Sequence, residues 1–186
     1  MYEQGKGIQA RYLEYIKKFT NTKTGIYTRR GLITFKKAAL FDYQVNIIMP
    51  ETFDITAVRQ VKHPFAFDPP LRVEVCNHDN SIHFALNLID NTREGWSAEE
   101  VIREFRLISE RLNPTGIYLG SGSGTGEQLP YAWIDFIKQV DNRQLYHMLI
   151  AAPVREQLLL VLFVCPDGEQ TEWKECLGEI REGITL

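Results

Sequence analysis

Seven residues in the middle of the chain, GSGSGTG (120–126), have a composition typical of loops that bind phosphate. A P-loop follows the pattern G-x-x-x-x-G-K-[ST], in which the lysine contacts the phosphates and the hydroxyl binds Mg²⁺. Here Gly126 is followed by Glu127, and the next lysine is Lys138. The spacing also breaks the G-x-G-x-x-G pattern of dinucleotide-binding folds. We therefore expect the glycine run to be a hairpin loop that joins two strands.

A second group, Cys76, His78 and His83, has side chains of the type that bind zinc. If Asp79-Asn80 is a two-residue turn, Cys76 stands opposite His83 across a hairpin, and His78 lies two residues along the same face. A metal-dependent hydrolase that uses these three residues is therefore one alternative function. The other interpretation is a polar face at the end of a hairpin, without metal.

Nucleophilic catalysis has less support in the sequence. Ser121 and Ser123 lack the G-x-S-x-G elbow between a strand and a helix. Asp135 and His147 lie on adjacent predicted strands, but no positioned nucleophile completes a triad. We expect a protein that is not an enzyme and needs no cofactor.

The charge is distributed unevenly along the chain. Residues 1–40 carry nine Lys and Arg against two Glu, a net charge of +7, whereas residues 41–186 carry 12 basic and 22 acidic residues, a net charge of −10. This basic N-terminal arm could bind an anion or nucleic acid, with Tyr27 and Phe35 between the basic residues, or it could lie on its own acidic body. The candidate anion-binding residues are Arg29, Arg30, Lys36 and Lys37. The acidic body argues against nucleic acid as the partner.

The segment YAWIDFIKQV (131–140) predicts a strand that is apolar on both faces. Tyr131, Trp133 and Ile137 share one face, which must meet either a helix of the same chain or a partner protein. The N-terminal helix could cover it, because Tyr12 and Tyr15 lie on the apolar stripe of that helix. These five aromatic and aliphatic residues are the candidate partner-binding set.

The order of elements indicates an α+β fold. The spacing of Ile8, Tyr12, Tyr15 and Phe19 predicts an N-terminal helix. Hairpin-linked strands follow on both sides of a helix that starts at Ser97. A last helix carries an apolar stripe of Trp173, Leu177, Ile180 and Ile184 on one face. Residues 50–70 hold four prolines and predict an irregular connection. We expect a central antiparallel sheet sandwiched by helices, with QLLLVLFVC (157–165) as a central strand covered on both sides.

The helix after Trp96 has the clearest signals. Ser97 and Glu100 form a capping box, and the spacing of the apolar residues predicts a stripe that faces the core. The stripe consists of Val101, Phe105, Ile108 and Leu112.

The composition is that of a soluble globular protein, with 44% hydrophobic and 24% charged residues. No apolar run reaches the roughly 20 residues of a membrane helix, and no secretory signal is visible. Three scattered cysteines predict buried thiols and no disulfide framework. We expect a cytoplasmic protein with residues 1–40 as an arm of helix and strand and residues 41–186 as the main domain, together in one compact unit.

The chain resembles a bacterial branch of the PsbP-like superfamily, which includes the Ran-binding Mog-type proteins. The resemblance covers roughly residues 41–186 and lies in three segments: YQVNIIMPETF, the helix WSAEEVIREFRLISERL, and the ending from LYHMLIAAPV to the helix with Trp173. It implies a central antiparallel sheet between helices and non-enzymatic roles such as accessory subunits, small-GTPase binders and bacterial chaperones for secreted effectors. No functional residue can be transferred, because no motif matches residue by residue.

The main hypothesis is a non-enzymatic module that binds another protein. Its most concrete version is a cytoplasmic chaperone or adaptor in a bacterium, with a homodimer as a further possibility. The alternatives are the metal-dependent hydrolase and anion or nucleic-acid binding by the basic arm.

Overall fold

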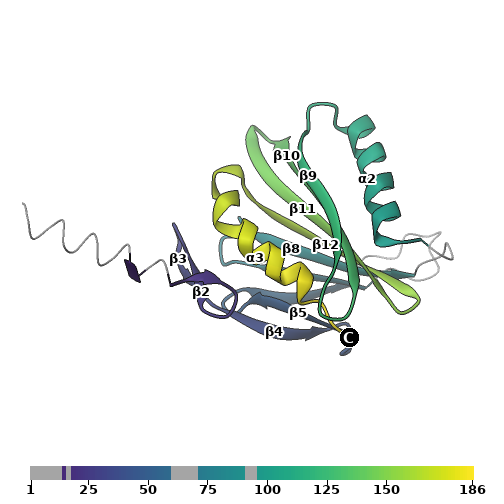
Figure 1. The fold of residues 1–186 in the computed structure, drawn as a ribbon. Coiled ribbons are helices and arrows are strands. Elements are labelled where there is room, and N and C mark those ends of the chain that lie inside the picture. Colours follow the sequence, from purple (N-terminus) through teal and green to yellow (C-terminus); the bar gives the residue numbers. More distant parts are fainter. Residues whose placement is uncertain (1–13, 16–17, 60–70, 91–95) are drawn as a thin grey trace, which may run out of the picture.

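A computed structural model describes residues 14–15, 18–59, 71–90 and 96–186 (Figure 1). The N-terminal part forms small sheets from β1 Thr20–Asn21, β2 Gly25–Thr28, β3 Gly31–Ile33, β4 Phe35–Leu40 and β5 Val45–Pro50. The main sheet contains β6 Asp54–Arg59, β7 Leu71–Cys76, β8 His83–Asp90, β9 Ile117–Thr125, β10 Pro130–Val140, β11 Arg143–Val154 and β12 Gln157–Pro166. The helices are α2 Ala98–Leu112, the 3₁₀ turn η1 Asp167–Glu169 and α3 Gln170–Glu182.

The main sheet is antiparallel throughout, with strand order β6-β7-β8-β12-β11-β10-β9. Consecutive strands pair as hairpins except at one seam, where β8 pairs with β12. Gln157 lies opposite Asp90 there and donates a hydrogen bond to it across 67 positions of sequence. The strand 157–165 is therefore central, as predicted.

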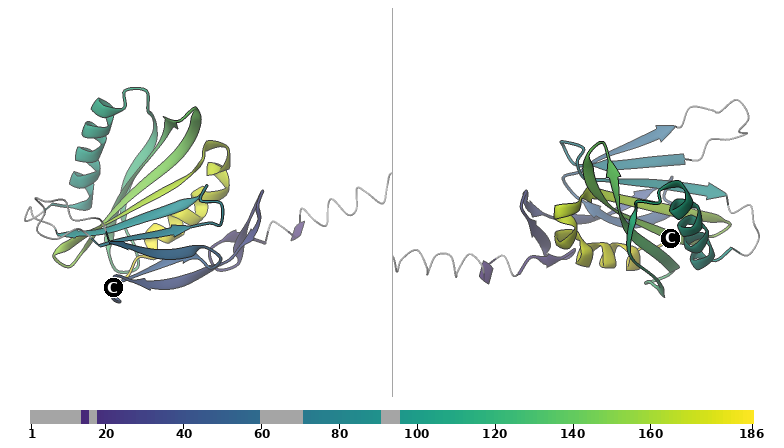
Figure 2. Two further views of the ribbon diagram at one scale, coloured as in Figure 1. Left: turned by 180° about the vertical axis from the view of Figure 1, so that it is seen from behind. Right: turned by 90° about the horizontal axis from the view of Figure 1, so that it is seen from above.

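One face of the sheet packs against α3 and against the two-stranded sheet of β4 and β5, and this side holds the larger core (Figures 1 and 2). Trp173 is fully buried in it, with Phe84 and Phe163 at ring-centroid distances of 6.3 and 5.2 Å. Ile47 and Met49 of β5 are also fully buried in this core. The apolar stripe predicted for the last helix is confirmed by its buried residues, Trp173, Cys176, Leu177 and Ile180.

The other face carries α2, which packs on β9, β10 and β11. Ala98 and Ile102 of the helix join Ile134 and Leu149 of the sheet in a second, smaller cluster. The capping box is present: Ser97 Oγ accepts from Glu100 N at 3.3 Å, and Glu100 Oε2 accepts from Ser97 N at 2.9 Å. Of the described helices, neither is both long and apolar enough to span a membrane.

The antiparallel α+β architecture is confirmed. Of the predicted N-terminal helix, only Glu14 and Tyr15 are described as helical, and the remainder, which includes Tyr12, lies mostly outside the described residues. The expectation of an irregular connection over 50–70 was wrong at its start, because β6 forms a ladder with β7 from Asp54 to Arg59. Residues 60–70 lie outside the described part.

The glycine run is a strand and not the predicted loop. Gly120, Gly122 and Gly124 belong to β9 and pair with Asp135, Trp133 and Tyr131 of β10. A Cβ atom on Gly122 would lie 3.1 Å from Trp133 Nε1, and one on Gly124 would lie 2.7 Å from Tyr131 Oη. The aromatic side chains of β10 thus occupy the space that the glycines leave, and this packing holds a weak strand former in the ladder.

Candidate partner-binding surface

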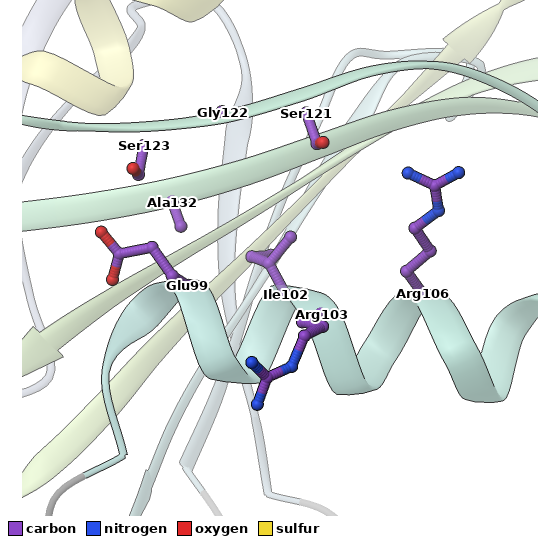
Figure 3. A pocket seen from close by; sticks show the side chains of 8 residues that line it. All are labelled: Glu99, Ile102, Arg103, Arg106, Ser121, Gly122, Ser123 and Ala132. Atoms are coloured by element: carbon purple, nitrogen blue, oxygen red, sulfur yellow. The ribbon is translucent and has the colours of Figure 1, made fainter.

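A pocket of about 270 Å³ lies between α2 and the β9 edge of the sheet (Figure 3). We call it the edge pocket, and its lining residues are Glu99, Ile102, Arg103, Arg106, Ser121, Gly122, Ser123 and Ala132. Ser121 and Ser123 pair with Ile134 and Ala132, so they share the α2 side of the sheet with them. Polar groups therefore line a pocket whose floor is apolar.

The charged groups of the edge pocket lie at its two ends. Glu99 and Arg106 both extend from α2 toward the strands, whereas the Arg103 side chain points away from them (Figure 3). The Arg106 guanidinium is held by Glu110 Oε1 at 2.8 Å and lies 5.6 Å from the centre of the Tyr118 ring. The edge pocket thus has one acidic end and one basic end whose basic group is oriented by its neighbours.

The opposite flank of α2 is apolar and exposed. Ile108 and Leu112 are 55% and 74% exposed, although the sequence places both on the predicted core stripe. That prediction was wrong because the buried residues of α2 are Ala98, Ile102 and Ser109, which lie on a line displaced around the helix from the predicted stripe. The stripe is consequently rotated toward solvent, with only Val101 and Phe105 partly buried.

This flank faces the half of the sheet that α2 does not reach. Ile108 lies about 200° around the helix from Arg106, so it points away from the β9 edge. Leu160 and Leu162 of β12 are partly buried on that side and pack against the same cluster as Val101. We call Val101, Ile108, Leu112, Leu160 and Leu162 the apolar corner. Beyond it the sheet continues through β8, β7 and β6 without another described helix over this face.

The predicted metal trio is not assembled. Cys76 and His83 do pair across the β7–β8 hairpin, but His78 lies in the exposed loop beyond the ladder. Among the described residues, no three His, Cys, Asp or Glu side chains are arranged to hold a metal ion. Burial raises the pKa of the Cys76 thiol and lowers the pKa of His83, so the pair is neutral near pH 7.

The loop instead serves as a hydrogen-bonded turn. Asp79 accepts hydrogen bonds from Ser81 N at 3.0 Å and from Asn77 Nδ2 at 2.7 Å. Its carboxylate also forms an ion pair with Arg30 Nη1 at 2.7 Å. These hydrogen bonds hold the pKa of Asp79 well below its usual range, with those from Ser81 as the largest cause. The hairpin is centred on Asp79-Asn80 as predicted, with Asn80 at a positive φ, but the connection runs over residues 77–82 and is not the predicted two-residue turn.

The four candidate anion-binding residues do not act as one group. Arg30 forms a two-pronged ion pair with the buried Glu169 of η1, with N···O distances of 2.9 and 2.8 Å. Arg29 pairs with Glu172 at 3.0 Å and donates to the backbone oxygen of Gly168. Lys36 and Lys37 lie apart from the arginines, exposed on β4. Both arginines thus bind the acidic C-terminal region of their own chain, which was the alternative considered for the arm.

The predicted partner-binding residues Tyr131 and Trp133 contact other parts of the same chain. Tyr131 is buried and Trp133 partly buried, and the Arg181 guanidinium of α3 lies over both rings at 5.6 and 4.6 Å. The described helix that covers this face is therefore α3, whereas most of the predicted N-terminal helix lies outside the described residues. Ile137 is partly buried opposite Ile117, and Tyr15 is exposed and stacks edge-on with Phe19 at 5.1 Å. Tyr12 lies outside the described residues.

The residues that line the two surfaces around α2 were missed by the sequence reasoning. Two signals were available: Glu99 and Arg106 are seven residues apart, which brings them to one flank of a helix, and no charged residue occurs between Arg111 and Glu127. The exposure of Ile108 and Leu112 had no signal in the sequence, because it depends on which side of the helix touches the sheet.

Comparison with known proteins identifies the fold. No family model matches the chain, and no curated protein matches its sequence. Among solved structures, cyanobacterial PsbP (CyanoP) from Synechocystis sp. PCC 6803 is similar with a TM-score of 0.60 at 8% identity, over 87% of this chain and 94% of that one. PA94 from Pseudomonas aeruginosa, described as a protein of unknown function and putative regulator, is similar with a TM-score of 0.50 at 10% identity, over 82% and 96%.

LpqN from Mycobacterium tuberculosis, described as involved in cell envelope biogenesis, is also similar, with a TM-score of 0.44 at 12% identity, over 86% of this chain and 94% of that one. The fold is PsbP-like, so the resemblance stated from the sequence is confirmed at the level of the fold. At these identities the similarity establishes architecture and no residue roles.

Proposed function

We propose that the protein is a non-enzymatic protein-binding module and that the apolar corner receives an apolar helical segment of its partner. The observation that supports it is the exposure of Ile108 and Leu112, one turn apart on the flank of α2 that also carries the partly buried Val101. Single exposed aliphatic residues are ordinary, but two large ones on one helix flank form an apolar patch of the kind that marks a binding surface. The most concrete role is a cytoplasmic chaperone or adaptor that shields such a segment.

A helix is the partner element that fits the apolar corner best. An amphipathic helix presents an apolar stripe, and such a stripe can contact Ile108 and Leu112 together because they lie one turn apart on α2. Each large apolar side chain that becomes fully buried contributes about 1.5–3 kcal/mol to binding, so Ile108 and Leu112 would be the main anchor residues on this chain.

The test uses an amphipathic peptide of 18 Leu and Lys residues that carries a fluorophore. We expect fluorescence anisotropy to show saturable binding to the wild-type protein and at least tenfold weaker binding to an Ile108→Glu/Leu112→Glu double variant. Tyr43→Glu is the matched control, because Tyr43 is 84% exposed at the β4–β5 turn, far along the chain from α2. Circular dichroism checks that all three proteins are folded. Equal affinity of the double variant, or no binding by the wild type, would contradict the proposal.

A further inference from the structure

Strand β9 is an edge strand without the usual protection. It is the terminal strand of the main sheet, so one side of its backbone has no strand partner among the described residues. Its nine residues, IYLGSGSGT, contain no charge and no proline. Natural edge strands are commonly protected by charged residues or proline, and the opposite edge strand β6 carries Asp54 and Arg59. An edge of this kind pairs readily with another strand.

The side chains of β9 permit a close and symmetric pairing. Ser121 and Ser123 flank Gly122 on the α2 side, and the glycines on the other side are covered by Trp133 and Tyr131. If a second β9 pairs antiparallel about Gly122, each Ser121 faces a Ser123 of the other copy. Small residues on both faces therefore leave no side chain in the way of a second backbone.

The charges of the edge pocket have the same symmetry. Glu99 and Arg106 lie at opposite ends of the edge pocket and are separated by seven residues, about 10 Å along the helix. A two-fold axis perpendicular to the sheet, midway between the two Gly122 residues, exchanges these ends. Glu99 of one copy then faces Arg106 of the other, twice per dimer.

We propose that a second copy of this chain pairs along β9, so that two seven-stranded sheets become one continuous antiparallel sheet. The helices α2 of the two copies then lie antiparallel on the same face. Strands are about 4.8 Å apart, and α2 packs mainly over β10, so the two helices are about 15 Å apart across the axis. Extended Glu and Arg side chains span that gap, and the two edge pockets join. The apolar corner lies on the far flank of α2 and stays free.

Charge-swap variants test the pairing by sedimentation equilibrium. We expect a wild-type dimer at low salt, and monomers for Glu99→Arg alone and for Arg106→Glu alone, because each single variant faces like charges across the axis. Mixing the two single variants restores both opposite-charge pairs, so we expect a heterodimer from two monomeric proteins. The Glu99→Arg/Arg106→Glu double variant dimerises with itself for the same reason.

A second variant tests the strand pairing independently of the helix charges. Leu119→Lys places a charge on the edge strand at a residue that is already 42% exposed, and we expect a folded monomer. Ile55→Lys on the opposite edge strand β6 is the matched control, also at 42% exposure, and it should remain a dimer. A monomeric wild type at high micromolar concentration would overturn the proposal. So would a dimer that persists in both single charge variants, or a mixture of them that fails to associate.

Discussion

Arg29 and Arg30 are adjacent in sequence, but the ion pairs that they form differ in how deeply they are buried. The Glu169 carboxylate that Arg30 binds is only 5% exposed, whereas Arg29 itself is 55% exposed. Removing one partner of a buried ion pair leaves an uncompensated charge. We expect Arg30→Ala to lower the free energy of unfolding by about 2–4 kcal/mol. Arg29→Ala is the control and should cost about 1 kcal/mol or less in the same urea titration. Equal losses would mean that the Glu169 carboxylate reaches water.

His147 makes the stability depend on pH. Burial lowers its pKa to about 4, and its ring stacks on Phe136 at 5.0 Å. The folded pKa lies below the ordinary value of 6.5, so the unfolded chain binds more protons between these two values. The contribution of neutral His147 to the free energy of unfolding is thus complete above pH 6.5 and is lost as the pH falls toward 4.

We expect this loss to be on the order of 1–2 kcal/mol, allowing for the partial exposure of the ring. Urea unfolding of the wild type and of His147→Leu between pH 4.5 and 7.5 measures it, because subtracting the two curves cancels the carboxylates common to both. A difference between the two proteins that stays constant with pH would show that His147 titrates normally.

At the scale of elements, two glycines should respond to alanine in opposite ways. A Cβ on Gly126, in the turn after β9, would overlap the backbone oxygen of Glu182, which accepts from Glu127 N at 2.8 Å. A Cβ on Gly178, within α3, meets nothing closer than 4.0 Å. We expect Gly126→Ala to destabilise the protein by about 1–3 kcal/mol and Gly178→Ala to stabilise it by up to about 1 kcal/mol. Thermal unfolding of both variants gives the two signs, and a stabilising Gly126→Ala would contradict the packing described for this turn.

Elements with local causes could be predicted from the sequence. The cap at Ser97 and Glu100 and the buried stripe around Trp173 depend on residues three or four apart, and both are present. Strand β9 depends on Trp133 and Tyr131 of the neighbouring strand, so its own composition suggested a loop. Nor does the sequence say which helix covers Tyr131, since either terminal helix has an apolar face. The surfaces around α2 were missed because the small residues Ala98 and Ser109 decide how the helix rests on the sheet.

At the scale of the whole molecule, the N-terminal sheet of β1 to β3 places two buried apolar side chains, Ile26 and Ile33, in the large core and is otherwise attached by polar contacts. These are the two arginine ion pairs and the hydrogen bonds from Thr22 N and Oγ1 to Glu179 Oε2. The interior strands β8, β12 and β11 are instead buried in the large core. Local opening is easiest where few buried apolar contacts hold a unit.

We therefore expect hydrogen exchange to occur in two steps. Amides of β2 and β3 should exchange at least tenfold faster than those of β8 and β12, and Arg30→Ala should accelerate β2 and β3 more than it accelerates the central strands. Exchange mass spectrometry of the intact chain measures both effects. Uniform protection across the two regions would show that they unfold together.

The seam between β8 and β12 has a consequence for the speed of folding. Every other strand pair of the main sheet joins neighbours in sequence, so hairpins on either side of the seam can form early and independently. The seam must close a loop of 67 residues that includes α2, and the entropy of that closure is lost before the new contacts compensate for it. The slow step of folding is then the joining of two preformed halves. A chain still emerging from the ribosome cannot take this step until β12 has been synthesised.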